Sequence, residues 1–267
     1  MKIEDCSALI TGASAGIGRE FARLLAGRAR SIVLVARRQQ RLEELRDELI
    51  QRHPNLQVHI RPADLAETAQ VDDLLNRLEQ DKIETDLLIN NAGLGDLGPF
   101  ATSDPERIKR IVLVNMLALT SITRRLLPSM VRNQRGAILN VSSSAGFLPI
   151  AEFSVYAASK AYVTSFSEGL RAELRGTGIS VCALCPGPVH TEFTEVAYRP
   201  GHRSSTGPEI VHISATDVAR IGLEAIEKDQ PLVVPGGFMK LGMLLVRMTP
   251  MPILRLASQF SAKRSRH

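Results

Sequence analysis

The residue pair best suited to chemistry in this sequence lies in YAASK, where Tyr156 is followed four residues later by Lys160. That separation places both side chains on the same face of a helix. A free phenol ionises near pH 10 and a neighbouring ammonium favours its charged form, so the pair predicts a tyrosine whose pKa is lowered. Such a phenol is a candidate general acid or base. The alternative is a tyrosine and a lysine that merely share a surface.

A glycine-rich turn, TGASAGIG, spans residues 11–18 directly after the first apolar run. Glycines let the backbone turn tightly and approach a pyrophosphate, whose charge is met by amides at a helix N-terminus. By itself this turn is equally consistent with an ordinary strand-to-helix connection. The turn residues that we expect to contact a dinucleotide are Gly12, Ser14, Gly16, Ile17 and Gly18.

Two arginines, Arg37 and Arg38, follow the second apolar run, where a site for NAD(H) usually carries an acidic residue. A carboxylate would repel a 2′-phosphate, whereas an arginine can pair with it through two hydrogen bonds. The sequence therefore favours NADP(H) over NAD(H). The alternative is a pair of solvated arginines at the start of a helix.

Short apolar runs rich in β-branched residues alternate with longer amphipathic stretches such as Arg41–Gln51 and Ala69–Asp81. These patterns predict strands buried on both faces, connected by helices. The alternation predicts a single-domain α/β fold of the Rossmann-like type, a doubly wound parallel sheet of about seven strands with helices on both faces. The expected strands are Ser7–Ile10, Ser31–Ala36, Gln57–Arg61, Leu87–Asn90, Ala137–Val141, Ile179–Cys185 and Leu232–Val234.

Several motifs occur in a fixed order between Thr11 and Thr191, and as a set they are highly specific. Asn90-Asn-Ala-Gly93 ends the fourth expected strand, at the edge where ligands of open α/β sheets bind. Together with TGASAGIG, Asn115, the serines 142–144, YAASK and Pro186-Gly187, it resembles the short-chain dehydrogenase/reductase family. No single motif carries this resemblance.

The resemblance implies four catalytic residues, which are Asn115, Ser143, Tyr156 and Lys160. Tyr156 would protonate a carbonyl oxygen as hydride arrives, and Lys160 would hold the nicotinamide ribose. The family spacing selects Ser143, thirteen residues before the tyrosine, to stabilise charge on the substrate oxygen. We expect its side chain to face opposite to those of its two serine neighbours. Asn115 would anchor a water in a proton relay, and a hydrogen-bonded core asparagine is the alternative.

The resemblance also extends the expected cofactor site beyond the glycine-rich turn and the two arginines. Asp64 and Leu65 match the residues that border the adenine, and Asp64 could cap the following helix at the same time or in place of that contact. Tyr156 and Lys160 are shared with the catalytic set. The remaining expected contacts are Asn91, Ala92, Gly93, Pro186, Gly187, Val189 and Thr191.

Residues 1–140 are expected to form mainly the cofactor-binding half and 141–267 the catalytic half of one domain, 1–267. The latter includes a substrate loop at 188–213, within an irregular stretch from Pro186 to Ser214. Ser214 to Asp217 then predicts a capping box that opens a helix. An apolar, basic tail covers 232–267, and we favour a pocket wall or subunit contact for it over peripheral contact with a membrane.

Composition narrows the remaining classes of function. The net charge of +5 comes from the tail, because six of the 33 Lys and Arg residues and no acidic residue follow Asp229, and only 4% of residues are aromatic. Neither feature favours nucleic-acid binding. The charged start MKIEDCSALI does not resemble an export signal, so we expect a cytoplasmic protein. Cys182 and Cys185 lie on one expected strand, where their sulfurs would diverge, and we expect no metal site.

The sequence thus predicts an NADPH-dependent oxidoreductase acting on a carbonyl or secondary alcohol of a medium to large apolar substrate. Reduction of 3-oxoacyl thioesters is the nearest alternative, and a non-catalytic sensor of NADPH is an alternative of another class. The resemblance further implies a homodimer or homotetramer, paired through the helix that holds YAASK and the helix before it.

Overall fold

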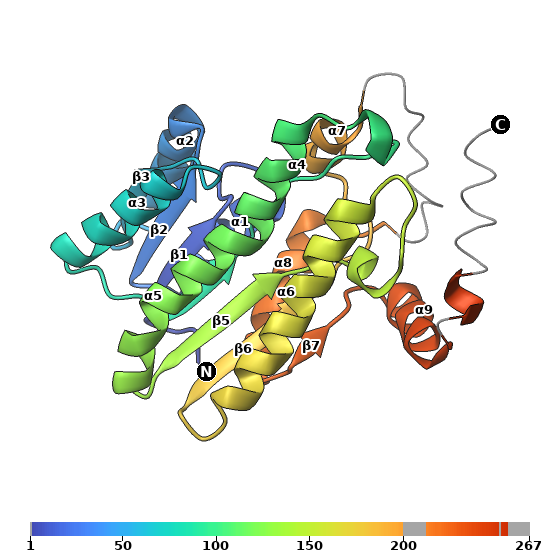
Figure 1. The fold of residues 1–267 in the computed structure, drawn as a ribbon. Coiled ribbons are helices and arrows are strands. Elements are labelled where there is room, and N and C mark those ends of the chain that lie inside the picture. The colour runs from blue at the N-terminus through green and yellow to red at the C-terminus, as the bar shows by residue number, and fades with distance from the viewer. Residues whose placement is uncertain (1, 200–211, 251, 256–267) are drawn as a thin grey trace.

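A seven-stranded sheet forms the centre of the molecule, and every pair of neighbouring strands runs parallel (Figure 1). The computed structural model describes residues 2–199, 212–250 and 252–255. The strand order is β3-β2-β1-β4-β5-β6-β7, which confirms the predicted doubly wound α/β class. The strands are β1 (Ser7–Thr11), β2 (Ser31–Ala36), β3 (Gln57–Pro62), β4 (Leu87–Asn90), β5 (Gly136–Val141), β6 (Ile179–Leu184) and β7 (Leu232–Val233).

Helices connect the strands and cover both faces of the sheet. The two helical stretches predicted at Arg41–Gln51 and Ala69–Asp81 correspond to α2 and α3, which begin and end within two residues of the predicted limits. The α-helices are α1 (Gly16–Leu25), α2 (Gln39–Arg52), α3 (Thr68–Gln80), α4 (Pro105–Val112), α5 (Leu119–Arg132), α6 (Ser154–Glu173), α7 (Glu192–Ala197), α8 (Ala215–Glu227) and α9 (Gly237–Met248). Shorter turns are η1 (Phe100–Thr102), the π-helical η2 (Leu113–Ala118) and η3 (Ser144–Phe147).

Two apolar layers hold the helices on the sheet. Phe21 of α1 and Leu45 of α2 lie in one buried cluster, together with side chains of α8. Leu74 of α3, Ile122 of α5 and Leu170 of α6 lie in the other, on the opposite face. Five of the strands are buried along their whole length, as expected where helices cover both faces of a parallel sheet.

The chain reverses its direction of growth across the sheet between β1 and β4. Parallel strands all end at one edge, and the point of reversal leaves a crevice there in which such sheets bind ligands. The glycine-rich turn follows β1 and Asn91 follows β4. Ser143 and Pro186 follow β5 and β6 by two residues each. The topology therefore brings the predicted motifs to a single edge.

The stretch from Pro186 to Ser214 is less irregular than its composition predicts. It contains α7, a helix of six residues without a side-chain cap, which is too short to give a recognisable apolar period. Residues 200–211 of the predicted substrate loop lie outside the described residues. The predicted helix start is confirmed, because Ser214 Oγ caps α8 by accepting a hydrogen bond of 3.0 Å from the Asp217 amide, and Ser214 Oγ also bonds Asp217 Oδ2 at 2.7 Å.

Among the described residues, one helical run, Pro105–Arg132, is long and apolar enough to cross a membrane by length and composition alone, with a mean hydropathy of 1.3. The run comprises α4, η2 and α5. Ile122 and Met130 on this run are buried in the apolar layer that it shares with α3 and α6. The apolar side chains on this face of the run therefore pack against the sheet.

The two cysteines of the CxxC spacing diverge as predicted. Cys182 lies in the layer beneath α8, whereas Cys185 Sγ lies 3.8 Å from Thr164 Oγ1 on α6, across the sheet. Burial raises the pKa of the Cys182 thiol to about 12 and that of Cys185 to about 11. All three cysteines are free, which fits a packing role for this pair.

Candidate active site

Tyr156 lies in the first turn of α6 among aromatic side chains. Its ring stacks on Phe153 with centroids 4.3 Å apart, and Phe193 of α7 lies at 5.4 Å on a tilted plane. Ser143 lies close enough to the phenol to lower its pKa. Tyr156 is only 8% exposed. The phenol therefore sits in an apolar pocket where β5 and α7 approach α6.

The environment moves the pKa of Tyr156 in the direction opposite to the sequence-based prediction. Burial raises the pKa of the phenol to about 12, and the hydrogen bond with Ser143 lowers it by less. Lys160 does not offset this shift, because its Nζ is bonded to the Val141 carbonyl, 5.7 Å from the ring centroid, and burial favours the neutral form of the amine. The prediction of a lowered phenol pKa was wrong for this structure, since loss of hydration outweighs attraction.

Lys160 points from α6 toward the end of β5. Its Nζ donates a hydrogen bond of 2.8 Å to the Val141 carbonyl, and only 4% of the residue is exposed. Burial lowers the pKa of Lys160 to about 8. A Cβ added at Gly93 would lie 3.4 Å from Nζ, so the turn after β4 passes directly beside the amine. Lys160 can therefore exchange a proton close to neutral pH.

The side chains of Ser142 and Ser143 have different partners. Ser142 Oγ donates a hydrogen bond of 2.8 Å to the Lys160 carbonyl, which fixes it against the interior of α6. Ser143 caps η3, where its Oγ accepts a hydrogen bond of 3.1 Å from the Ala145 amide. Ser143 also lowers the pKa of the Tyr156 phenol, whereas Ser142 Oγ is bonded to the Lys160 carbonyl and to Thr164 Oγ1.

Asn115 lies in the π-helical turn η2, a local irregularity that often marks a functional position. Its Oδ1 accepts a hydrogen bond of 2.8 Å from the Leu94 amide, and its Nδ2 donates bonds of 2.9 Å to the Leu94 carbonyl and to Ser159 Oγ. The side-chain amide thus joins the turn after β4 to α6. Both sequence readings are compatible with this position, because Asn115 is a bonded core residue beside the tyrosine and lysine.

The glycine-rich turn is packed against the end of β4. Asn91 Nδ2 donates a hydrogen bond of 2.9 Å to the Thr11 carbonyl, and Thr11 Oγ1 accepts bonds of 3.0 Å from the amides of Asn91 and Ala92. Gly12 has a φ of +68°, and a Cβ there would lie 2.8 Å from Asn91 Nδ2. A Cβ at Gly16 would lie 3.1 Å from Thr191 Cγ2. The turn therefore leaves backbone rather than side chains facing the crevice.

The rest of the glycine-rich turn lies as a dinucleotide site requires. Gly18 is buried within the first turn of α1, and a Cβ there would lie 2.5 Å from Asn91 Nδ2. Ile17 packs partly against the core. Amides of this helix N-terminus would meet a pyrophosphate. The donor set and the close backbone approach thus fit a dinucleotide.

The two arginines predicted to select NADP(H) have different partners. Arg37 is 54% exposed and its Nη1 lies 4.0 Å from Asp64 Oδ2. Arg38 Nη1 donates a hydrogen bond of 2.8 Å to Glu192 Oε2, and its Nη2 donates one of 3.2 Å to Ser14 Oγ. The guanidinium of Arg38 therefore spans the glycine-rich turn and α7.

Asp64 forms a local turn rather than the predicted alternative, a cap on α3. Its Oδ1 accepts a hydrogen bond of 3.0 Å from the Ala66 amide, while Glu67 precedes α3 without a side-chain cap. Burial alone would raise the pKa of Asp64, but the hydrogen bond from Arg110 and weaker contacts lower it overall. Leu65 is buried beside it. The pair borders the outer end of the crevice.

The segment after β6 closes the other end of the crevice. The Pro186 carbonyl accepts a hydrogen bond of 2.8 Å from the Ser144 amide, which holds it beside Ser143. A Cβ at Gly187 would lie 2.6 Å from Met239 Cε of α9. Val189 forms an isolated bridge with Ile213. The predicted cofactor residues from both halves of the chain thus line one continuous edge.

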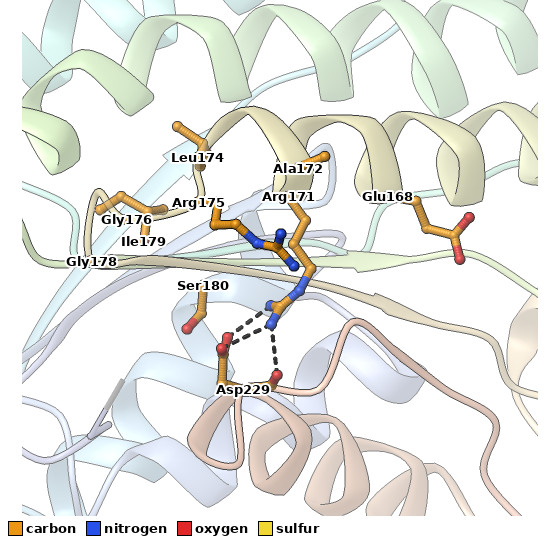
Figure 2. Close-up of a pocket in the computed structure, with 10 residues that line it drawn as sticks. All are labelled: Glu168, Arg171, Ala172, Leu174, Arg175, Gly176, Gly178, Ile179, Ser180 and Asp229. Atoms are coloured by element: carbon orange, nitrogen blue, oxygen red, sulfur yellow. Dashed lines mark hydrogen bonds and ion pairs between the residues drawn. The ribbon is translucent and has the colours of Figure 1, made fainter.

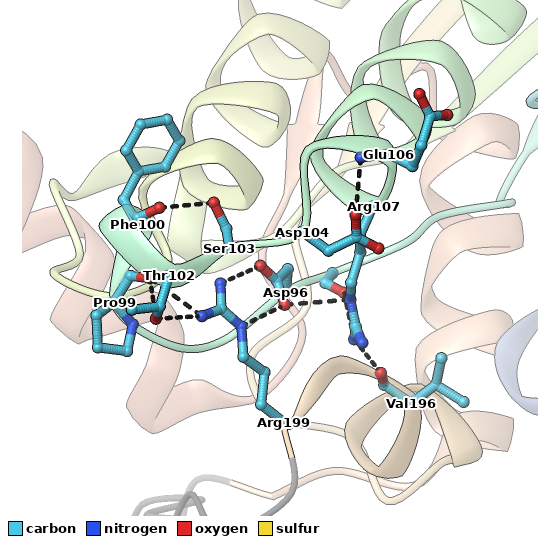
Figure 3. Close-up of polar contacts among 11 residues, drawn as sticks. Asp96, Pro99, Phe100, Thr102, Ser103, Asp104, Glu106, Arg107, Val196 and Arg199 are labelled. Carbon is cyan, nitrogen blue, oxygen red and sulfur yellow. Dashed lines mark hydrogen bonds and ion pairs between the residues drawn. The ribbon is translucent and has the colours of Figure 1, made fainter.

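A buried carboxylate that the sequence analysis missed fixes α7 (Figure 3). The Asp96 side chain is 1% exposed and pairs with Arg199 Nη2 at 2.5 Å and with Arg107 Nε at 3.1 Å. Arg107 also donates to the Val196 carbonyl, and Arg199 Nη1 donates a bond of 3.0 Å to that of Pro99. Asp96 lies outside every motif, and the only sequence signal was its place just after Asn90-Asn-Ala-Gly93.

A second depression, of about 790 Å³, lies away from these residues (Figure 2). Ile179 and Ser180 at the start of β6 line it, so it opens at the amino ends of the strands. Arg171 of α6 crosses it and pairs with Asp229 through bonds of 2.7 and 2.8 Å. Its position separates it from the crevice that holds Tyr156.

The fold and this crevice define a dinucleotide-binding α/β protein with a Ser–Tyr–Lys constellation. The family model of short chain dehydrogenase matches residues 7–200. The chain therefore belongs to the short-chain dehydrogenase family.

Individual relatives and a solved structure are similar over most of their length. NADP-dependent 3-hydroxy acid dehydrogenase YdfG of Escherichia coli K12 is 35% identical over 215 residues, 79% of this chain and 85% of the relative. Sulfoacetaldehyde reductase of Chromohalobacter salexigens is 40% identical over 195 residues, 72% and 75% of the two chains. A short-chain dehydrogenase from Sphingobium yanoikuyae, solved in complex with NADPH, is 34% identical, with a TM-score of 0.79 over 86% of this chain and 87% of its own.

Replacement of Lys160 by methionine tests the burial of its ammonium. An unfolded lysine titrates near 10.5 and the folded one near 8, so between these values the unfolded chain binds more protons and wild-type stability rises with pH. The free energy of unfolding of the wild type relative to Lys160→Met should rise by about 3 kcal/mol across this window. Urea unfolding from pH 7 to 10.5 measures it. Exposed Lys228→Met serves as control, and a flat difference for Lys160→Met would contradict the lowered pKa.

Replacement of Asp96 by asparagine should loosen α7. Removing one partner of a buried ion pair costs about 3–5 kcal/mol, and we expect about 1–3 here because Arg107 and Arg199 are partly exposed. Hydrogen exchange should quicken in residues 192–199 more than in β4 and β5. Asp72→Asn, an exposed change on α3, is the control. Equal exchange in both variants would show that Asp96 does not hold α7.

Proposed function

We propose that this protein is an NADP(H)-dependent oxidoreductase that transfers hydride between nicotinamide and a carbonyl or secondary alcohol of an apolar small molecule. Membership of the family and relatives that act on CH–OH groups support the reaction class. The observation that carries the proposal is Tyr156, buried beside Ser143 and Lys160 at the carboxyl edge of the sheet.

Different residues of the crevice would bind different groups of the cofactor. The glycine-rich turn would hold the pyrophosphate, Arg37 and Arg38 the 2′-phosphate, and Lys160 the nicotinamide ribose. Thr191 would meet the carboxamide from beside Gly16. When bound, the cofactor supplies or accepts the hydride. The preference for NADP(H) is also supported by the NADP-dependent relative and by the NADPH-bound structure.

The side chains of the protein would donate the proton to the substrate oxygen and then replace it. With its pKa raised to about 12, Tyr156 is a neutral phenol at pH 7 and is ready to donate to a carbonyl oxygen, the direction needed for reduction. Ser143 already accepts a hydrogen bond from the Ala145 amide, so its hydroxyl proton can be directed at the same oxygen. Lys160, with a pKa of about 8, can return a proton to the phenol. Asn115 would position the turn beside it.

Aromatic packing supports an apolar substrate. Phe153 and Phe193 flank the phenol, and Met239 of α9 lies against Gly187. The names of the relatives add a second candidate, because a 3-hydroxy acid and sulfoacetaldehyde are small acidic molecules. A 3-oxoacyl thioester remains the alternative with a larger acyl group. A sensor of NADPH would not need Ser143, Tyr156 and Lys160 together.

Activity assays separate these proposals. We expect NADPH oxidation with members of a panel of apolar ketones, 3-oxo acids, sulfoacetaldehyde and 3-oxoacyl thioesters. Tyr156→Phe should lower kcat by about 10²–10⁴-fold because the proton donor is lost, and Ser143→Ala by about 10²-fold. Tyr162→Phe on the same helix removes a hydroxyl that bonds Thr120 and is the control. Tight NADPH binding without turnover of any substrate would favour the sensor, and full activity of Tyr156→Phe would refute the assignment.

The apolar helix α9 is proposed to form a subunit contact on its outer side. Phe238, Leu241 and Leu245 are 64%, 58% and 59% exposed, whereas Met239 faces the crevice. A homodimer or homotetramer would cover these side chains. Contact with an anionic membrane is the alternative, since Lys240 lies on the same helix and only basic charges follow it.

Double replacement Leu241→Ser and Leu245→Ser decides between the two uses of α9. A subunit contact predicts that the variant has a lower molar mass than the wild type by light scattering. Membrane contact predicts that only the wild type floats with phosphatidylserine vesicles. Exposed Val112→Ser, on α4, is the control. A monomeric wild type would reject the oligomer.

The single domain spanning 1–267 and the cytoplasmic location remain predictions. The continuous sheet supports the single domain.

A further inference from the structure

Glu192, the first residue of α7, holds two arginines that lie beside the end of β2. Its Oε2 accepts a hydrogen bond of 2.8 Å from Arg38 Nη1, and its Oε1 accepts one of 2.5 Å from Arg41 Nη1. These bonds, with that from Arg38 the stronger, lower the pKa of the Glu192 carboxyl. The Glu192 carboxylate therefore lies near the end of β2, where the strand itself ends without an acidic residue.

Both terminal nitrogens of the Arg38 guanidinium have a hydrogen-bond partner. Nη1 bonds Glu192 and Nη2 donates a bond of 3.2 Å to Ser14 Oγ in the glycine-rich turn. An arginine has five N–H donors, and a phosphate that binds Arg38 through two parallel N–H groups competes with Glu192 and Ser14 for this guanidinium. Arg37 is held more loosely, because its side chain is 54% exposed and its Nη1 lies 4.0 Å from Asp64 Oδ2. The two arginines are therefore not equivalent toward an incoming anion.

We propose that Glu192 is a specificity-determining residue that competes with the 2′-phosphate of the cofactor for Arg38 and Arg41; this inference rests on the proposed use of NADP(H). A phosphate monoester carries up to two negative charges and can replace a carboxylate on two arginines. A ribose hydroxyl carries no charge and leaves the ion pairs in place. Glu192 therefore weakens binding of NADP(H) but not of NAD(H), and narrows the discrimination between them.

The same competition connects the cofactor to the substrate side of the crevice. Phe193 follows Glu192, and its ring lies 5.4 Å from that of Tyr156. A Cβ at Gly95 would lie 2.9 Å from Phe193 Cζ, so this ring has little room to move independently of α7. Release of Glu192 by a 2′-phosphate thus frees the helix end whose next residue packs on the phenol. Asp96 and its arginines hold the opposite end of α7 in place.

Calorimetric titration of Glu192→Gln with four nucleotides tests this role. NADPH and 2′,5′-ADP carry the 2′-phosphate, whereas NADH and 5′-ADP lack it. We expect Glu192→Gln to bind the first two about two- to fivefold more tightly at low salt, the range of an exposed ion pair, and the last two unchanged within twofold. The gain should shrink at high salt because the charges are screened. Glu195→Gln, three residues along α7, is the matched control.

A double-mutant cycle adds a readout that a purely structural role of Glu192 would not move. In an Arg38→Gln background, the gain from Glu192→Gln for 2′,5′-ADP should fall, because one of the two contested guanidiniums is gone. An equal change for all four nucleotides, no change, or weaker NADPH binding would each overturn the competition. The proposed cofactor preference is tested on the wild type alone. A wild type that binds NADH as tightly as NADPH would overturn that preference, whatever the Glu192 variants show.

Discussion

The hydrogen bonds between Asn91 and Thr11 are the constraint on which the crevice depends. A parallel sheet that grows in opposite directions from β1 and β4 separates at their carboxyl ends, where no further backbone pairing joins them. The Asn91 side chain bonds the Thr11 carbonyl at 2.9 Å, and Thr11 Oγ1 binds two amides in return. This bridge fixes the glycine-rich turn relative to the strand that leads to Asn115, and therefore fixes the cofactor end relative to the proton-transfer end.

Burial decides the electrostatics of the proton-transfer end. Tyr156 and Lys160 are both removed from water, and each is shifted toward its neutral form, with pKa values of about 12 and about 8. The amine is held by a backbone carbonyl rather than by a carboxylate. A site built in this way keeps the phenol protonated and the amine close to its titration point. This division suits donation of a proton to a carbonyl oxygen followed by recharging of the donor.

The sequence predicted the sheet almost completely, because buried parallel strands are continuous apolar runs whose composition is set by packing on both faces. It also placed Ser143, Tyr156 and Lys160 within reach of one another, since spacing on a helix and family order fix their neighbours. It failed for the phenol pKa, which depends on how deeply α7 covers the ring. The ion pairs of Glu192 with Arg38 and of Asp96 with Arg199 were also missed, because partners about 100 or more residues apart leave no local pattern.

The three thiols are buried on both sides of the sheet, and burial raises each pKa well above the physiological range, to about 12, 12 and 11 for Cys6, Cys182 and Cys185. A thiolate is the form that reacts with alkylating agents and peroxide. The cysteines of the folded chain should therefore resist both reagents. Labelling of these cysteines would in turn report the rate at which the core opens, giving the protein a built-in probe of its own unfolding.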